Sequence, residues 1–72
     1  MDLFIIRLKE LRQNKAVSQK NVGIAVEISG RAYNDIERGR TRPAFDTLIS
    51  LADYFDVSLD YLAGRSEIKE RR

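Results

Sequence analysis

The stretch SQKNVGIAVEISGRAYNDIERGRTR, residues 18–42, decides the fold of this chain. Ser18 and Ser29 can each cap the start of a short helix with the side-chain hydroxyl. The second of these helices ends at Gly39, because glycine readily adopts the left-handed conformation that stops a helix. A basic segment follows, and Pro43 closes it. The pattern predicts two short helices joined by a tight turn.

On both sides of this stretch, apolar residues recur at three- and four-residue spacing, which indicates amphipathic helices. One helix is expected over 3–14, with Asp2 as its N-cap, and another over 44–55. A last short helix begins after Ser58 and ends at Gly64. The apolar positions of these helices are Phe4, Leu8, Leu11, Phe45, Leu48, Ile49, Ala52, Phe55, Leu59 and Leu62. Because no alternating strand pattern occurs, we expect an all-α, compact five-helix domain.

The composition excludes several classes of site. The chain has 72 residues, enough for one small domain, and 43% of them are apolar, so it is not a disordered tail. It has no cysteine and no histidine, which removes thiolate and imidazole ligands and imidazole acid–base catalysis. No Gly-rich phosphate loop and no convincing carboxylate pair is present. We therefore expect no enzyme, no metal and no cofactor.

Charge is distributed unevenly, although the net charge is only +2. Residues 1–42 carry nine Lys or Arg against five Asp or Glu, whereas residues 43–64 carry four Asp and no basic residue. Residues 65–72 carry four basic and two acidic residues. A basic half beside an acidic half suits a protein that approaches a polyanion from one side, and a mixed, solvated surface is the alternative. The apolar run at 3–6 is far too short to span a membrane.

Together these features resemble the phage-repressor/Cro-type helix-turn-helix domains, also called the xenobiotic-response-element type. The residues that carry the resemblance are RLKELR at 7–12, Ser18-Gln19, Ser29, Ile36-Glu37-Arg38-Gly39, the basic loop before Pro43, and TLISLADYFDVSLDYLAGR at 47–65. The resemblance implies a lambda-repressor-like fold over residues 1–64. The charged tail, 65–72, is expected to be frayed or to extend the last helix. Ala16, Glu27 and Asp56 stand where the family often has Gly or Asn.

The resemblance implies that the second helix of the motif, roughly 30–38, lies in the major groove of double-stranded DNA. The expected base contacts are Ser29, Arg31, Asn34 and Asp35. Arg31 can donate two hydrogen bonds to guanine, and Asn34 can bridge adenine. Asp35 can accept from cytosine, or it can turn aside to pair with Arg31 or Arg38. Gly30 has no side chain at a position where the family has a base-contacting one.

Phosphate contacts are expected at both ends of the motif. They are Gln19, Lys20, Tyr33, Arg38, Arg40, Thr41 and Arg42. Tyr33 is expected mainly in the core, with its hydroxyl reaching the rim. A solubilising role for the arginine-rich loop is the alternative. The resemblance also implies a structural ion pair between Arg12 and Glu37; the alternative is that both are exposed and contribute little.

Such domains generally bind paired operator half-sites as homodimers, so the resemblance implies a cytoplasmic transcriptional regulator, foremost a repressor, encoded by a bacterium or phage. Candidate dimer contacts are Leu59, Tyr61, Leu62 and Ile68. The alternative for Leu59 and Leu62 is that they close the monomer core. No membrane partner and no small-molecule effector is expected. An antitoxin or adaptor that binds a protein, such as a toxin, is the other functional reading, and the basic loop argues against it.

Overall fold

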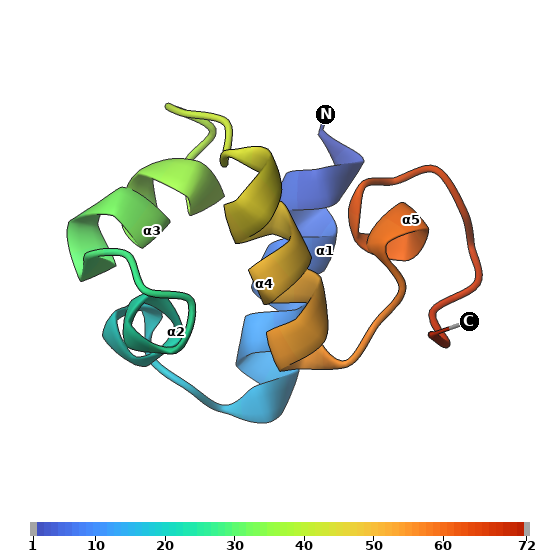
Figure 1. Ribbon diagram of the computed structural model, residues 1–72, viewed down its shortest axis with the longest axis horizontal. Coiled ribbons are helices and arrows are strands. Elements are labelled where there is room, and N and C mark those ends of the chain that lie inside the picture. Colours follow the sequence, from blue (N-terminus) through green and yellow to red (C-terminus); the bar gives the residue numbers. More distant parts are fainter. Residues whose placement is uncertain (1, 72) are drawn as a thin grey trace.

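The computed structural model describes residues 2–71, which form five helices with short connections (Figure 1). The helices are α1 (Leu3–Lys15), α2 (Gln19–Ala25), α3 (Gly30–Glu37), α4 (Phe45–Phe55) and α5 (Leu59–Leu62). No strand occurs between residues 2 and 71, so the all-α prediction is confirmed. Met1 and Arg72, the outer ends of the two expected ranges, lie outside the described residues. Within the described part, no helix is both long and apolar enough to span a bilayer.

Four of the five helices begin at the side-chain caps predicted from the sequence. Asp2, Ser18, Ser29 and Ser58 each accept a hydrogen bond from a backbone N–H in the first turn of the following helix. Such a cap typically stabilises a helix by about 1 kcal/mol. The fifth helix, α4, begins after Ala44 without a side-chain cap. Short polar side chains therefore define where most of the helices start.

Three non-glycine residues adopt the left-handed conformation: Ala16 (φ 58°), Glu27 (φ 63°) and Asp56 (φ 55°). These are the positions at which the resemblance described above implies Gly or Asn. The chain thus keeps the turn geometry without glycine, at a cost of about 1–2 kcal/mol for Ala or Glu and less for Asp. Ala16 and Asp56 end α1 and α4, and Glu27 lies in the turn between α2 and α3.

The core contains the apolar faces of all five helices. Its buried residues are Phe4, Leu8, Leu11, Val22, Val26, Tyr33, Ile36, Leu51, Ala52, Val57 and Leu62. Leu48, Phe55 and Leu59 are partly buried against this core, whereas Phe45 (66% exposed) and Ile49 (36% exposed) are not part of it. Phe45 is the first residue of α4, which begins at the edge of the molecule beside the loop that follows α3 (Figure 1). Periodicity placed both side chains on an apolar stripe, but no element among residues 2–71 buries that end of the stripe.

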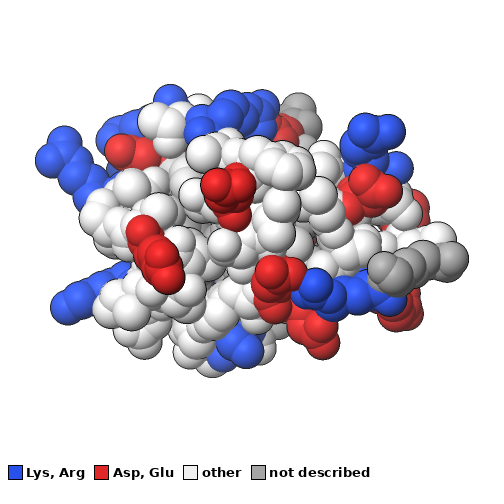
Figure 2. Space-filling view, viewed as in Figure 1, with Lys and Arg blue, Asp and Glu red and all other residues white. Residues whose placement is uncertain are grey.

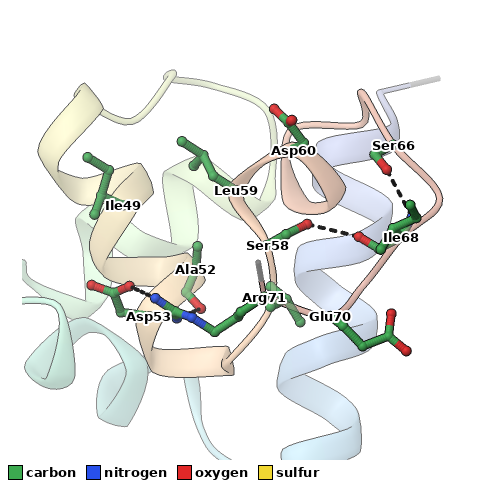
Figure 3. Close-up of a pocket in the computed structure, with 11 residues that line it drawn as sticks. Ile49, Ala52, Asp53, Ser58, Leu59, Asp60, Ser66, Ile68, Glu70 and Arg71 are labelled. Carbon is green, nitrogen blue, oxygen red and sulfur yellow. Dashed lines mark hydrogen bonds and ion pairs between the residues drawn. The ribbon is translucent and has the colours of Figure 1, made fainter.

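Residues 65–71 do not extend α5 as a helix. They form an irregular segment, here called the tail, that folds back toward α4 (Figures 1 and 3). Ser58 binds the tail twice, since its backbone N–H and its hydroxyl donate to two tail carbonyl oxygens, both at 2.9 Å. The Arg71 guanidinium donates to the Asp53 carboxylate at 2.6 Å. The tail is therefore not a helical extension of α5.

Arg7 connects the tail to α1. Its side chain is buried, and its guanidinium lies 4.0 Å from the centre of the Tyr61 ring. The same group donates to the Tyr61 carbonyl oxygen at 2.5 Å and to the Ser66 carbonyl oxygen at 2.8 Å, and it pairs with Glu67 at 3.1 Å. A buried arginine is stable only when it is paired and hydrogen-bonded, and these contacts meet that requirement.

Because Ala16 is held at a positive φ, we expect Ala16→Gly to stabilise the domain by about 0.5–1 kcal/mol. Relief of the left-handed strain outweighs the greater freedom of glycine in the unfolded chain. Ala63→Gly is the matched control, since Ala63 ends α5 at φ −73° and gains nothing from glycine. Urea denaturation of both variants measures the difference. An equal loss of stability in the two variants would contradict the strain at Ala16.

Candidate nucleic-acid interface

The angle between α2 and α3 is set by a close backbone contact in the turn between them. The Ile28 N–H donates to the Gly23 carbonyl oxygen at 2.8 Å. A Cβ atom on Gly23 would lie 2.9 Å from the Ile28 carbonyl oxygen, closer than side chains are found. Any larger residue at position 23 would push the turn away from α2. Gly23, together with the left-handed Glu27, thus fixes how α3 leaves α2.

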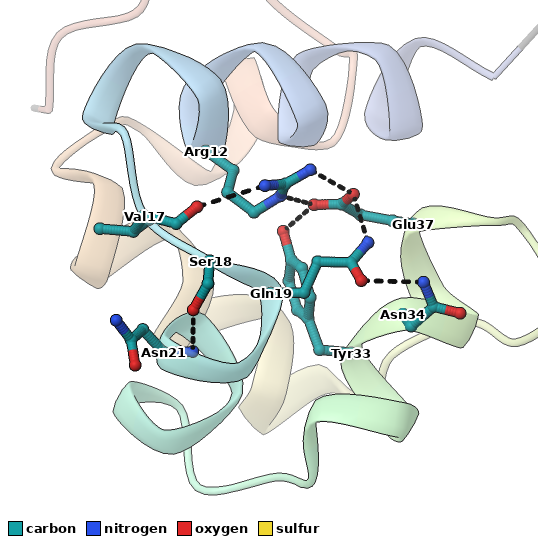
Figure 4. A network of polar contacts seen from close by, with 8 residues as sticks. All are labelled: Arg12, Val17, Ser18, Gln19, Asn21, Tyr33, Asn34 and Glu37. Carbon is teal, nitrogen blue, oxygen red and sulfur yellow. Dashed lines mark hydrogen bonds and ion pairs between the residues drawn. The ribbon is translucent and has the colours of Figure 1, made fainter.

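A buried carboxylate joins α3 to α1 and α2 (Figure 4). Glu37, which is 2% exposed, accepts from Arg12 Nε at 2.6 Å and from Arg12 Nη2 at 3.2 Å. The Tyr33 hydroxyl donates to Glu37 Oε2 at 2.5 Å, and Gln19 Nε2 donates to Glu37 Oε1 at 3.1 Å. No buried side-chain nitrogen or oxygen in the described part of the chain lacks a partner. The structure therefore brings Arg12 and Glu37 together in a bidentate, largely buried pair.

The network keeps its groups in fixed protonation states. Burial raises the pKa of Glu37, but hydrogen bonds from Arg12, Tyr33 and Gln19 outweigh burial and leave this pKa below its ordinary value. Burial, followed by the hydrogen bond to Glu37, raises the pKa of Tyr33 far above its usual range. The hydrogen bond with Glu37 raises the pKa of Arg12. Near neutral pH the network thus holds one carboxylate, one guanidinium and one neutral phenol.

The same network reaches the surface through Gln19. The Gln19 side-chain oxygen accepts from Asn34 Nδ2 at 2.9 Å, while its amide nitrogen donates to Glu37. A predicted phosphate contact, Gln19, and a predicted base contact, Asn34, therefore touch one another. Both side chains are half-buried, so their amide groups are oriented by the protein before any ligand arrives.

The loop after α3 carries the predicted phosphate-binding set Arg38, Arg40, Thr41 and Arg42, here called the clamp, and all four residues are exposed. Lys and Arg side chains gather along the edge of the molecule that this loop forms (Figure 2). Arg31 and Lys20 are exposed as well, on α3 and α2. Ser29 caps α3, with its hydroxyl oxygen accepting from the Ala32 N–H at 2.9 Å.

Tyr33 is not a phosphate contact. Its side chain is fully buried, with 0% exposure, and its hydroxyl donates to Glu37. The hydroxyl satisfies a buried carboxylate and cannot reach the rim. The prediction of a core position for Tyr33 is thus confirmed, whereas the phosphate contact is wrong.

Asp35 pairs with Arg40, at 3.6 Å, rather than with Arg31 or Arg38. The chain reverses at Gly39, where φ is 75°, and the Arg40 backbone N–H donates to the Asp35 carbonyl oxygen at 2.9 Å. This reversal brings the Arg40 side chain back over α3. Arg31 and Arg38 form no ion pair with another residue between 2 and 71, and Arg31 is therefore left available to a ligand.

At the other end of the molecule, a groove of about 680 Å³ lies between α4, α5 and the tail (Figure 3). Its apolar lining includes Ile49, Leu59 and Ile68, and Ile68 is 43% exposed. Of the candidate dimer contacts, Leu62 is fully buried and closes the core, so that candidate is wrong. Tyr61 is half-buried beneath the Arg7 guanidinium.

Comparisons with known proteins agree with this geometry. The helix-turn-helix family model matches residues 8–62. The HTH-type transcriptional regulator ImmR of Bacillus subtilis (strain 168) is 35% identical over 65 residues, which cover 90% of this chain and 51% of the relative. The HTH-type transcriptional regulator DdrOP3 of Deinococcus deserti is 42% identical over 59 residues, which cover 81% of this chain and 46% of the relative. The chain thus spans about half the length of these relatives, whose names are those of regulators and not of enzymes.

Among solved structures, the P22 c2 repressor in complex with a synthetic operator superposes with a TM-score of 0.84. The sequences are 27% identical, and the match covers 92% of this chain and 100% of that chain. The five-helix arrangement is therefore that of a repressor domain of the lambda type.

Because Glu37 is buried and accepts hydrogen bonds from three residues, Glu37→Gln is expected to destabilise the domain by about 3 kcal/mol near neutral pH. The pKa of Glu37 is lowered on folding, so its contribution is complete above the unfolded value near 4.5 and is lost as pH falls through the folded value. The difference between wild type and variant should consequently shrink in acid.

Thermal melts across this pH range measure both effects. Glu10→Gln, at an exposed position of α1, is the control and should leave the melting temperature within about a degree or two. An unchanged melting temperature for Glu37→Gln at pH 7 would mean that the buried pair contributes little.

Proposed function

The chain belongs to the helix-turn-helix family, and on that premise we propose that it is a sequence-specific regulator of transcription that binds double-stranded DNA. The observation that carries this proposal is the position of α3, which the Arg12–Glu37 network holds against the scaffold beside an exposed arginine loop. A repressor is the form of regulator that we favour, because the solved neighbour is a repressor in complex with an operator.

In this proposal α3 enters the major groove and its first turns read base edges. Arg31 is exposed and has no ion-pair partner among residues 2–71. Its guanidinium is therefore available to donate two hydrogen bonds to guanine. Asn34, oriented by Gln19, would read adenine, and Ser29 would lie at the entry of the helix. Packing does not require a glycine at position 30, since a Cβ there would meet Lys20 at ordinary distances of 3.4 Å or more. Gly30 would instead leave room for the DNA to approach.

Contacts with the phosphate backbone of DNA would come from Gln19 and Lys20 at the start of α2 and from the clamp after α3. Each phosphate that a cation neutralises releases condensed counterions, so binding should weaken steeply with salt. These contacts carry no sequence information, but they fix the register in which α3 meets the bases.

We further propose that two copies bind paired half-sites through the groove end of the molecule. The Cα trace is 29 Å long, with α3 near one end and α5 with the tail near the other (Figure 1). Two copies joined in line at the groove ends would place their α3 helices up to about twice this length apart, so the two long axes would have to be inclined for the helices to lie one DNA turn, about 34–36 Å, apart. Ile49, Leu59 and Ile68 supply the apolar surface for such a contact.

Selection of bound duplexes from a random pool tests the proposal, since it yields both the operator and the half-site spacing. On the selected duplex, Arg31→Ala should weaken binding by about 1–3 kcal/mol and relax the preference at one base pair. Arg65→Ala is the control, because Arg65 is exposed beyond α5. Uniform weakening across all sequences would make Arg31 a phosphate contact. Absence of duplex binding at low salt would overturn the DNA proposal and favour a protein-binding module.

If the groove is the dimer contact, Ile68→Asp should lower the mass measured by light scattering toward that of the monomer. A charge placed among apolar side chains at an interface is strongly disfavoured. Ile24→Asp is the matched control, because Ile24 is also exposed, at 65%, but lies on α2. Equal masses for both variants and the wild type over a range of concentrations would argue against the groove.

A further inference from the structure

We propose that Asp2 and Asp35 weaken the sequence-independent binding of this chain to DNA and so keep it from occupying unrelated sequences. In the unbound protein these two carboxylates pair with Arg42 and Arg40, the clamp residues that would otherwise bind any phosphate. The inference rests on the DNA-binding function proposed above.

The first pair ties the clamp to the recognition helix. Arg40 is 59% exposed and Asp35 is 27% exposed, and their side chains approach to 3.6 Å. The backbone adds a second link, because the Arg40 N–H donates to the Asp35 carbonyl oxygen at 2.9 Å. Asp35 thus lies on α3 with its carboxylate turned to the loop, next to the residues that would face DNA.

The second pair ties the clamp to the start of α1. One oxygen of Asp2 accepts from the Phe4 N–H at 3.0 Å and caps the helix, while the other oxygen pairs with Arg42. The hydrogen bond from Arg42 lowers the pKa of Asp2, so the carboxylate is charged at neutral pH. Arg42 remains 73% exposed and can turn toward a phosphate without moving the backbone.

The pairing divides the arginines of this edge into two classes. Arg31 and Arg38 have no ion-pair partner among residues 2–71, whereas Arg40 and Arg42 each have one. Exposed arginine–carboxylate pairs are weak, so a phosphate can displace the carboxylate. The displaced carboxylate then remains within about a Debye length of the DNA and repels it.

The effect on DNA occupancy follows from where this repulsion acts. It reduces the electrostatic attraction that all DNA sequences share, and it leaves the base contacts of a correct site unchanged. Lowering this common attraction does not change the ratio of affinities, but it leaves wrong sites unoccupied at protein concentrations that still fill a correct site. In the unbound protein, Asp2 and Asp35 would therefore occupy the arginines that phosphates contact in the complex.

Asp35→Asn and Asp2→Asn test the inference, because each removes a charge with little change of shape. Asn is also a good N-cap, so Asp2→Asn keeps the start of α1 while it removes the partner of Arg42. Binding to a random-sequence duplex is measured against salt, beside binding to the selected operator. Each variant should bind the random duplex about 3–10-fold more tightly near 0.1 M salt, with a log–log salt slope steeper by up to about one unit. Affinity for the operator should rise by a similar factor, so that each variant occupies random sequence at protein concentrations at which the wild type occupies only the operator.

Glu10→Gln is the matched control, since it changes the net charge equally at an exposed position of α1. An equal gain in Glu10→Gln would reduce the effect to net charge and overturn the inference. So would unchanged random binding in both aspartate variants, or a loss of operator binding alone in Asp35→Asn, which would make Asp35 a base reader. Wild-type protein that fails to bind any duplex at low salt would instead overturn the proposed function.

Discussion

The buried carboxylate of Glu37 is the interaction on which the position of α3 depends. Helices of seven and eight residues are too short to be stable alone, so α2 and α3 take their places from the contacts they make. Burying a carboxylate is costly unless donors surround it, and here the donors come from α1, α2 and α3 itself. Removing any one donor leaves the charge partly unsatisfied. The network consequently holds three helices in one arrangement rather than in a range of them.

This network also divides α3 into a buried face that holds the helix in place and an exposed face that is proposed to contact DNA. Tyr33 and Glu37, four residues apart, face inward, while Arg31 lies on the exposed side. Gln19 connects the two sides, because one end of its amide contacts Glu37 and the other contacts Asn34. A change in the buried Arg12–Glu37 pair would therefore alter the orientation of Asn34, a side chain proposed to read DNA, although Glu37 itself is buried.

The features predictable from the sequence are the local ones. The caps at Ser18, Ser29 and Ser58 need only a short polar side chain before an apolar periodicity, and all three were predicted. Contacts between residues far apart in the sequence were not predicted from the local pattern. Periodicity put Phe45 on an apolar stripe but carries no information on whether another element covers it. The folded tail depends on Arg7, nearly sixty residues earlier, and a charged octapeptide gives no sign of such a partner.

The Arg12–Glu37 pair is the exception among the long-range contacts, because only the family resemblance suggested it. Composition and spacing alone allow many pairings of thirteen basic with eleven acidic residues. The Asp2–Arg42 and Asp35–Arg40 pairs show the difficulty, since the sequence offers Arg31 and Arg38 as equally good partners for Asp35. The choice is made by the backbone reversal at Gly39, which is a consequence of the fold.

Folding also changes the charge pattern of the linear chain. Arg71 returns to α4, where it meets Asp53 at 2.6 Å and Asp56 at 3.8 Å, so the acidic middle of the chain is partly neutralised by its basic end. At the opposite edge, Asp2 and Asp35 offset part of the clamp. If two copies meet at the groove end, this neutralisation lowers the repulsion between like-charged surfaces. Arg31 and Arg38, which have no ion-pair partner among residues 2–71, lie on and at the end of the helix proposed to read the bases, so that electrostatic approach and sequence recognition would share one surface.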